Sequence, residues 1–194
     1  METRDVLALL EKEAEETGVP ILRAAEREIL IKAARSAKPK RILEIGTAIG
    51  FSAMLLAEAC PEAEIDTIEI DERRHARAEA AVAEAGLAGR IFCRRGDAAE
   101  ILPSLSGPYD FVYLDGPKGQ YLRHLKLAEP LLYSGAVICA DNVLFRGLVA
   151  GDAMPPHRYR TIVFRLREYV SYVSKQYETE IFEEGDGMAV SRRR

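Results

Sequence analysis

The sequence has no tryptophan and only three cysteines, Cys60, Cys93 and Cys139, among its 194 residues. The three lie far apart, so none has the close spacing that zinc sites use, and their number is odd. Neither a disulfide scaffold nor a structural zinc site is therefore expected. We expect reduced, buried thiols, which is the usual state of free cysteine in a protein core.

Long hydrophobic runs are also missing from the chain. No stretch approaches the roughly 20 apolar residues that span a bilayer, and the first 16 residues are amphipathic and acidic, unlike a signal peptide. The composition, 48% hydrophobic and 30% charged without low-complexity runs, is typical of a folded protein. The sequence predicts a cytoplasmic protein with one domain over 1–194, in which helices over 1–38 precede a core over 39–194.

The chain as a whole has no excess of positive charge, since its net charge is −4. This charge disfavours a general nucleic-acid binder. The charge is nevertheless uneven along the chain. Between residues 142 and 175, six lysines and arginines stand against two acidic residues. A solvated outer helix face explains such a segment, and so does a surface for a polyanion.

Hydrophobic periodicity supplies the architecture. Amphipathic helical stretches over 3–16 and 21–37 are followed by short β-branched runs that alternate with longer helical ones, which predicts βαβ units. A last helix over 161–175 precedes two strands around the turn at 185–187, which indicates an antiparallel hairpin. The expected strands are 41–45, 64–70, 90–95, 111–115, 136–141, 178–182 and 188–191, with helices over 52–59, 72–85 and 120–132. The predicted fold class is α/β, with a mostly parallel seven-stranded sheet that ends in a C-terminal antiparallel hairpin and has helices on both faces. This arrangement resembles the Rossmann-like methyltransferase fold.

The first chemical motif, Glu44-Ile-Gly46-Thr47-Ala-Ile-Gly50, lies where the first strand ends and a helix begins. Its glycines permit a tight turn and let a ligand approach the backbone at the helix N-terminus. Glu44 stands ahead of the first glycine, where a carboxylate suits a cationic amino group better than a pyrophosphate. S-adenosylmethionine has such a group. A turn that needs glycine only for close packing remains the alternative.

Two further carboxylates follow the next strands. Glu69 lies 23 positions after Gly46, where it can accept hydrogen bonds from both ribose hydroxyls, and Asp97-Ala98 follows the third strand beside the expected adenine pocket. Either carboxylate alone would be explained equally well as a solvated charge at a strand end. Together they predict a site for the adenosine part of the cofactor.

A second motif places oxygen ligands at the ends of the fourth and fifth strands. Asp115 closes one strand and Asp141-Asn142 closes the other, and adjacent parallel strands bring these tips to one edge of the sheet. Two carboxylates and an amide carbonyl suit Mg²⁺ or Mn²⁺ better than zinc. Lys118, three positions after Asp115, is a candidate general base for a substrate hydroxyl. The alternatives are a solvated first-turn lysine and a turn cap at Asp141-Asn142.

The motifs Glu-Ile-Gly-Thr-x-x-Gly-x-Ser at 44–52, Leu-Asp-x-x-Lys-x-x-Tyr at 114–121 and Asp-Asn-Val-Leu at 141–144 resemble those of the catechol and caffeoyl-CoA type O-methyltransferases. The resemblance covers nearly everything after residue 18. It implies metal binding by Asp115, Asp141 and Asn142, with Asp115 also bordering the cofactor. It further implies cofactor contacts at Val19, Gly46, Ser52, Glu69, Asp97 and Ala98. Gly116-Pro117 departs from the family pattern and leaves the shape of the loop before Lys118 open.

Within that family, residues 118–121, 141–147 and 158–160 look most like the bacterial enzymes that methylate 5-hydroxyuridine in tRNA. This resemblance implies that the 5-hydroxyl and the adjacent O4 of a wobble uridine chelate the metal. Arg158, Arg160 and Arg165 are the candidate RNA contacts. A small catechol-like phenol is the alternative substrate, because vicinal oxygens chelate a metal in the same way. A nicotinamide oxidoreductase and a non-catalytic binding module are less favoured. A homodimer is expected, and the helices over 3–16 and 21–37 offer either a dimer surface or a substrate lid.

Overall fold

A computed structural model describes residues 1–193 of the chain. Its helices are α1 (Thr3–Thr17), α2 (Ala24–Ala37), α3 (Phe51–Ala59), α4 (Glu72–Glu84), α5 (Ala98–Ile101), α6 (Tyr121–Ala128) and α7 (Arg160–Gln176). Its strands are β1 (Arg41–Ile45), β2 (Glu64–Glu69), β3 (Ile91–Arg95), β4 (Tyr109–Leu114), β5 (Leu132–Ala140), β6 (Glu178–Phe182) and β7 (Met188–Arg192). Short 3₁₀ turns include η2 (Lys118–Gln120) and η4 (His157–Tyr159). None of the helices described in residues 1–193 is both long and apolar enough to cross a membrane.

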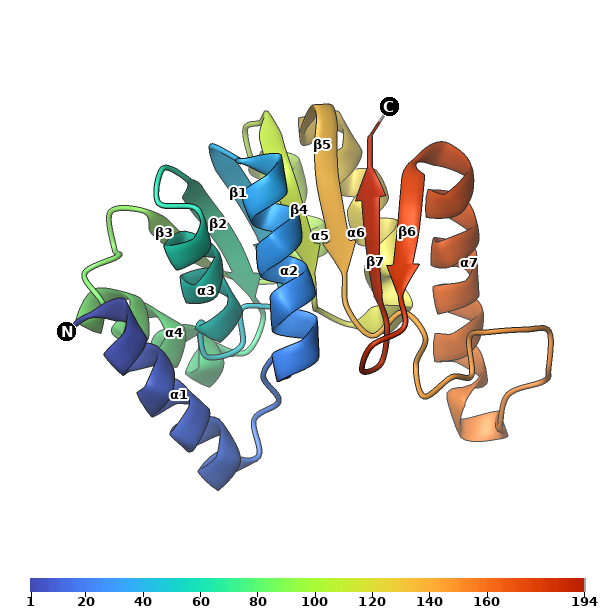
Figure 1. Ribbon diagram of the computed structural model, residues 1–194, viewed down its shortest axis with the longest axis horizontal. Coiled ribbons are helices and arrows are strands. Elements are labelled where there is room, and N and C mark those ends of the chain that lie inside the picture. Colours follow the sequence, from blue (N-terminus) through green and yellow to red (C-terminus); the bar gives the residue numbers. More distant parts are fainter. Residues whose placement is uncertain (194) are drawn as a thin grey trace.

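All seven strands form one sheet in the order β3-β2-β1-β4-β5-β7-β6. The first five strands run parallel, whereas β7 is antiparallel to both β5 and β6. Figure 1 shows the hairpin of β6 and β7 completing the sheet beside β5. The predicted fold class, a Rossmann-like methyltransferase sheet with a C-terminal antiparallel hairpin, is confirmed.

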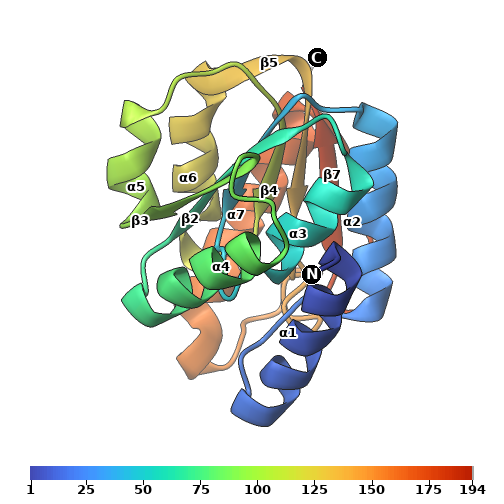
Figure 2. The same cartoon turned by 90° about the vertical axis from the view of Figure 1, so that its left-hand side faces the viewer.

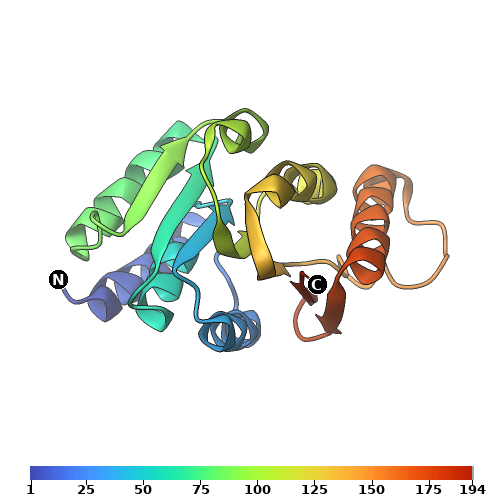
Figure 3. The ribbon, with the colours of Figure 1, turned by 90° about the horizontal axis from the view of Figure 1, so that it is seen from above.

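Helices cover both faces of the sheet because successive strand residues point to opposite sides. Ile42 packs into a core with α1, α2 and α3, whereas the next residue, Leu43, packs into a second core with α6 and α7. The views from the side and from above show α2 and α6 on opposite sides of the sheet (Figures 2 and 3). Both cores are continuous apolar layers, as expected for parallel strands buried on both faces.

Three predicted boundaries differ from the structure by three residues or more. The second helix begins at Ala24 instead of residue 21, and residues 19–23 run without helical hydrogen bonds. The helix expected over 120–132 ends at Ala128, where a 3₁₀ turn containing Pro130 leads into β5. The strand β5 therefore begins at Leu132, four residues before the expected start at 136. The first difference matters for the site, since residues 20–23 lie along its rim.

The segment after β5 is held by the hairpin turn. The N–H groups of Val143 and Leu144 donate to the carbonyls of Gly187 and Asp186, at 2.9 and 3.0 Å. Asn142 has a φ of 54°, a left-handed conformation that asparagine tolerates better than most residues. The rest of this connection extends away from the sheet before α7 begins (Figure 1). The β6–β7 turn therefore fixes the backbone just beyond Asp141.

Candidate active site

The cradle after β1 depends on close backbone contacts. Gly46 has a φ of 104°, and a Cβ there would lie 2.5 Å from the carbonyl oxygen of Asp115, so no other residue fits. The N–H groups of Gly46 and Thr47 donate to the carbonyl of Ile68 at 3.0 and 3.2 Å. These contacts hold the turn between the ends of β2 and β4, which explains why the motif has glycine at position 46.

Glu44 lies beneath this cradle and not among the residues that line the cavity above it. One carboxylate oxygen accepts a hydrogen bond from the Thr67 hydroxyl, which also contacts the Thr47 hydroxyl at 2.6 Å. Burial raises the pKa of the Glu44 carboxyl to about 7, although hydrogen bonds from Ser52 and Thr67 counter the rise. Glu44, Thr47 and Ser52 thus support the cradle from below without lining the cavity, and their predicted cofactor contacts stay predictions.

A cavity of about 370 Å³ opens above the carboxyl ends of the parallel strands. It brings together most of the residues predicted for the cofactor and the metal, namely Gly46, Glu69, Asp97, Ala98, Asp115, Lys118, Asp141 and Asn142. Val19 lies elsewhere, in a separate hollow between α1 and the extended segment before α2. The position of the cavity is where open α/β sheets bind ligands.

The carboxylates at the adenosine end are oriented by backbone groups. Glu69 accepts hydrogen bonds from the N–H groups of Ala48 at 2.8 Å and Asp71 at 2.9 Å, one on each oxygen. Asp97 caps α5 by accepting from the N–H of Ala99 at 2.8 Å. Carboxylate oxygens have lone pairs to spare after these contacts, so both side chains can still accept hydrogen bonds from a ligand.

The other end of the cavity holds two acidic side chains. Burial raises the pKa of Asp141 to about 7, and the neighbouring charge of Asp115 raises it further. Burial also raises the pKa of Asp115 to about 6, although the ammonium of Lys118, 3.7 Å away, opposes the shift. The Tyr121 hydroxyl donates to the Asp141 carbonyl at 3.0 Å and so fixes the backbone of this corner.

Whether these residues suit a metal depends on their donor atoms. Across residues 1–193, no three side chains of His, Cys, Asp or Glu gather as a ready metal cluster. The predicted set consists instead of two carboxylates and the Asn142 amide, all of them hard oxygen donors. A divalent cation would compensate the two carboxylates that burial now disfavours, so the residues present fit Mg²⁺ or Mn²⁺, and metal binding remains a prediction.

Several residues of the cavity wall were not predicted. Residues 20–23 and Glu26 reach it from the N-terminal segment, and Arg74, Gln120 and His124 reach it from other elements. Gln120 and His124 are four positions apart, the spacing of one helix face, and this signal could have paired them. Nothing in the local pattern indicates residues 20–26, because their position depends on how α2 packs against the sheet.

The three arginines predicted to contact RNA differ in their surroundings. The guanidinium of Arg158 lies 4.5 Å from the centre of the Tyr159 ring, and Arg146 donates to the Tyr159 hydroxyl at 3.0 Å. Arg165 pairs with Glu168 at 2.9 Å on the exposed side of α7, and Arg160 donates to the Pro155 carbonyl at 3.4 Å. The structure therefore groups Arg158 with Arg146 and Tyr159, while Arg165 already has an anionic partner.

Comparisons with known proteins agree with this geometry. Residues 6–194 match the family model described as O-methyltransferase. The chain is 36% identical over 155 residues to a protein of Mycobacterium tuberculosis named probable O-methyltransferase, covering 74% of this chain and 66% of that protein, just under two thirds of its length. It is 32% identical over 155 residues to a catechol O-methyltransferase of Niastella koreensis, covering 76% of this chain and 70% of that enzyme.

A solved structure supports the same assignment. The S-adenosylhomocysteine-bound methyltransferase PaMTH1 of Podospora anserina superimposes with a TM-score of 0.83 at 26% identity, covering 98% of this chain and 88% of that one. The predicted resemblance to the catechol and caffeoyl-CoA type is confirmed, and the oxidoreductase alternative is excluded by it. The match over nearly the whole sequence shows that this chain belongs to the O-methyltransferase family.

Proposed function

We propose that this protein transfers the methyl group of S-adenosylmethionine to a hydroxyl of 5-hydroxyuridine in tRNA. The observation that carries the chemistry is one continuous cavity that has Glu69 and Asp97 at one end and Asp115, Asp141 and Lys118 at the other. A cofactor that spans this distance would present its methyl group to the acidic corner. Homologous structures with bound S-adenosylhomocysteine support the cofactor assignment.

The cofactor end matches adenosine chemically. Glu69 is held by two backbone N–H groups and can accept hydrogen bonds from the ribose hydroxyls. Asp97 and Ala98 lie where the adenine would follow. The narrow turn at Gly46 lets the methionine part approach the backbone between β1 and β4. These contacts orient the sulfonium without taking part in the reaction.

Asp115, Asp141 and Asn142 would hold a divalent metal at the acidic corner. When bound, such a metal lowers the pKa of a hydroxyl that it contacts and holds the oxygen in place. Within residues 1–193, Lys118 is the only cationic group paired with either carboxylate, and it contacts Asp115. This supports a site that is completed by a ligand.

In its neutral amine form, Lys118 would take the proton from the substrate hydroxyl, because an ammonium has no lone pair to accept one. The oxygen then attacks the methyl carbon, so that a carbon–oxygen bond forms while the carbon–sulfur bond breaks and S-adenosylhomocysteine leaves. The remaining protein contribution is alignment of the two reactants and exclusion of water, which can supply several kcal/mol of the barrier reduction. The transfer needs no covalent intermediate on the protein.

The basic surface beyond Asn142 favours RNA as the substrate. Arg146 and Arg158 lie four and 16 positions after Asn142, and both contact Tyr159. A guanidinium group next to an aromatic ring suits the binding of phosphates or unstacked bases. The 5-hydroxyl and O4 of the base are adjacent oxygens that could both approach the acidic corner. Such contacts would position the RNA without performing chemistry.

A small phenol is the second candidate, and a specific observation favours it. Relatives that share about a third of their residues with this chain are named catechol O-methyltransferases. Vicinal phenolic hydroxyls offer the same pair of adjacent oxygens as 5-hydroxyuridine. The cavity volume of about 370 Å³ accommodates either ring.

The two candidates are separated by an experiment on the basic surface. Replacing Arg158 and Arg160 with alanine should raise the KM for 5-hydroxyuridine-containing tRNA roughly tenfold and flatten its salt dependence, while catechol turnover and cofactor affinity stay unchanged. Arg165→Ala should have a smaller effect, because Glu168 already pairs with that arginine. Methoxyuridine formation is measured by mass spectrometry of the tRNA nucleosides. A wild-type protein that methylates catechols but not this tRNA would establish the phenol instead.

A further inference from the structure

Glu26, near the start of α2, is a buried carboxylate that the reaction described above does not use. Only 1% of the residue is exposed, yet it lines the cavity together with Asp141 and Asn142. Its Oε2 atom has no hydrogen-bond partner among residues 1–193. A buried, unpartnered carboxylate oxygen is costly to a folded protein and is rarely present without a reason.

The position of Glu26 is fixed by the hairpin turn. Its Oε1 atom accepts from the N–H of Asp186 at 3.3 Å, and a Cβ at Gly185 would lie 2.0 Å from the same oxygen. The carboxylate is thus wedged against the turn that also holds the backbone after Asp141. Because one oxygen meets the turn, the other is left for a donor that the protein itself does not supply.

Glu26 lies at the acidic end of the cavity. Burial is the main reason for the raised pKa of Asp141, and the charge of Glu26 is among those that raise it further. The adenosine end, with Glu69 and Asp97, is formed by the opposite half of the sheet. A donor for Glu26 is therefore to be sought on the substrate and not on the adenine.

We infer that Glu26 reads the substrate base by accepting a hydrogen bond from the ring N3–H of uracil. The inference rests on the proposed function, in which the 5-hydroxyl and O4 face the acidic corner. On the uracil ring, N3–H is adjacent to the C4 carbonyl. It is the hydrogen-bond donor that a ring nitrogen provides. It would supply the hydrogen bond that Oε2 lacks.

This role makes Glu26 a determinant of base identity. Cytosine has a lone pair at N3 in place of the hydrogen, so it would face the carboxylate with repulsion and leave it unsatisfied. It also has an amino group in place of O4, so it loses one oxygen of the pair that faces the acidic corner. A site built around a buried acceptor rejects a ligand that lacks the donor more strongly than one that merely fits less well. The protein should therefore distinguish 5-hydroxyuridine from 5-hydroxycytidine, although both carry the same reactive hydroxyl.

The test compares two short RNA oligonucleotides that differ only in a single 5-hydroxyuridine or 5-hydroxycytidine. The wild-type protein should prefer the uridine by more than roughly 10- to 100-fold in kcat/KM, because one hydrogen bond to a charged acceptor contributes that factor and the missing O4 adds to it. Glu26→Gln keeps the shape and can still accept from Asp186, but its amide N–H can donate to the cytosine N3. The preference should then fall at least roughly tenfold, with unchanged S-adenosylhomocysteine affinity by calorimetry.

Glu28→Gln is the matched control, since Glu28 is an exposed glutamate on the same helix, and it should keep the wild-type preference. A wild-type protein that methylates both oligonucleotides equally would overturn the role of Glu26, as would a Glu26→Gln variant with the wild-type preference. A wild-type protein that methylates neither oligonucleotide would instead remove the proposed function, and the base-reading role with it. The two failures are thus distinguishable.

Discussion

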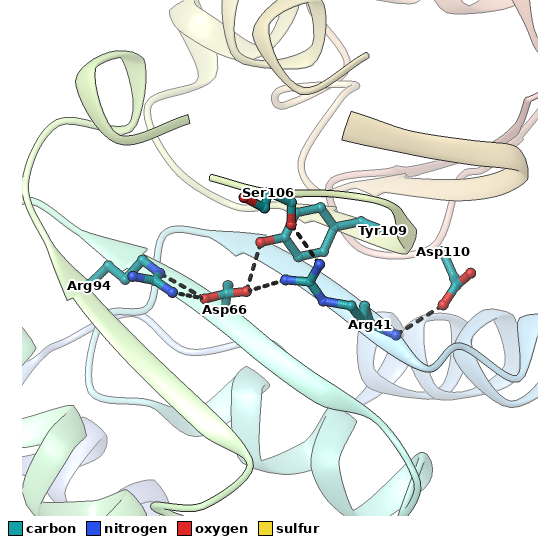
Figure 4. A network of polar contacts seen from close by, with 6 residues as sticks. All are labelled: Arg41, Asp66, Arg94, Ser106, Tyr109 and Asp110. Atoms are coloured by element: carbon teal, nitrogen blue, oxygen red, sulfur yellow. Dashed lines mark hydrogen bonds and ion pairs between the residues drawn. The ribbon is translucent and has the colours of Figure 1, made fainter. Parts of the chain in front are cut away.

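Two buried aspartates, Asp66 and Asp141, have opposite surroundings. Asp66 in β2 accepts hydrogen bonds from Arg94 at 2.7 Å, Arg41 at 3.1 Å and the Tyr109 hydroxyl at 2.7 Å (Figure 4). Asp141, just after β5, has on its carboxylate a hydrogen bond from the N–H of Asn142, at 2.7 Å, and no other from the residues that the structure describes. One carboxylate is fully compensated by the protein, and the other lies beside further negative charge.

This difference separates stability from function. The network around Asp66 ties β1, β2, β3 and β4 together away from the cavity, and its two arginines neutralise the buried charge. At the carboxyl edge, Asp115 and Asp141 are kept close together at a cost in free energy, which is typical of sites that wait for a ligand. Substitutions in the two regions should therefore have opposite consequences.

The largest effect is expected at the acidic edge. Asp141→Ala should lower methyl transfer on the order of 100-fold or more, since it removes a metal ligand worth several kcal/mol to the reaction. Affinity for S-adenosylhomocysteine, measured by calorimetry, should survive because Asp141 is assigned to the metal. Retained turnover with lost cofactor affinity would reverse that assignment.

At the compensated site the expected loss is in stability. Asp66→Ala should lower the free energy of unfolding by about 3 kcal/mol, because the buried Tyr109 hydroxyl and two guanidinium groups lose their shared acceptor. Denaturant unfolding measures the change, and Asp141→Ala should cost less than about 1 kcal/mol in the same assay. Equal losses in the two variants would mean that the two regions do not differ as described.

A smaller effect is expected at Glu69. Glu69→Ala should weaken S-adenosylmethionine binding by about 1–3 kcal/mol, the scale of lost hydrogen bonds to a charged acceptor. Glu72→Ala, at an exposed position at the start of α4, is the control and should leave the affinity unchanged. An unchanged dissociation constant for the Glu69 variant would place the ribose elsewhere in the cavity.

Much of the acidic edge and the cradle was predictable from sequence. Glycine at position 46 and carboxylates at the ends of successive strands are local signals, and parallel pairing necessarily brings strand ends to one edge. The role of Glu44 was less predictable. Its position ahead of the glycine suggested a ligand contact, whereas strand alternation turns its side chain into the layer beneath the cradle.

The remaining wall of the cavity depends on contacts between distant segments. Glu26 meets the hairpin turn 160 positions later in the chain, and no local pattern encodes that approach. The polar network of Asp66 likewise joins Arg41, Arg94 and Tyr109 from three other strands. Charge count alone could not show that this aspartate is compensated while Asp141 is not.

The decisive measurement is the unfolding free energy between pH 5 and pH 8, with and without Mg²⁺. Burial raises the pKa of Asp115 to about 6 and of Asp141 to about 7, so in metal-free protein their contribution to stability is present at low pH and lost as the pH rises through 6 to 7. At pH 8, Mg²⁺ at 100 times its dissociation constant should restore about 2.7 kcal/mol to the wild type. Asp141→Asn should show a weaker pH dependence and little response to Mg²⁺. A wild-type protein that Mg²⁺ does not stabilise, or stabilises no more than this variant, would contradict a metal site at the acidic edge.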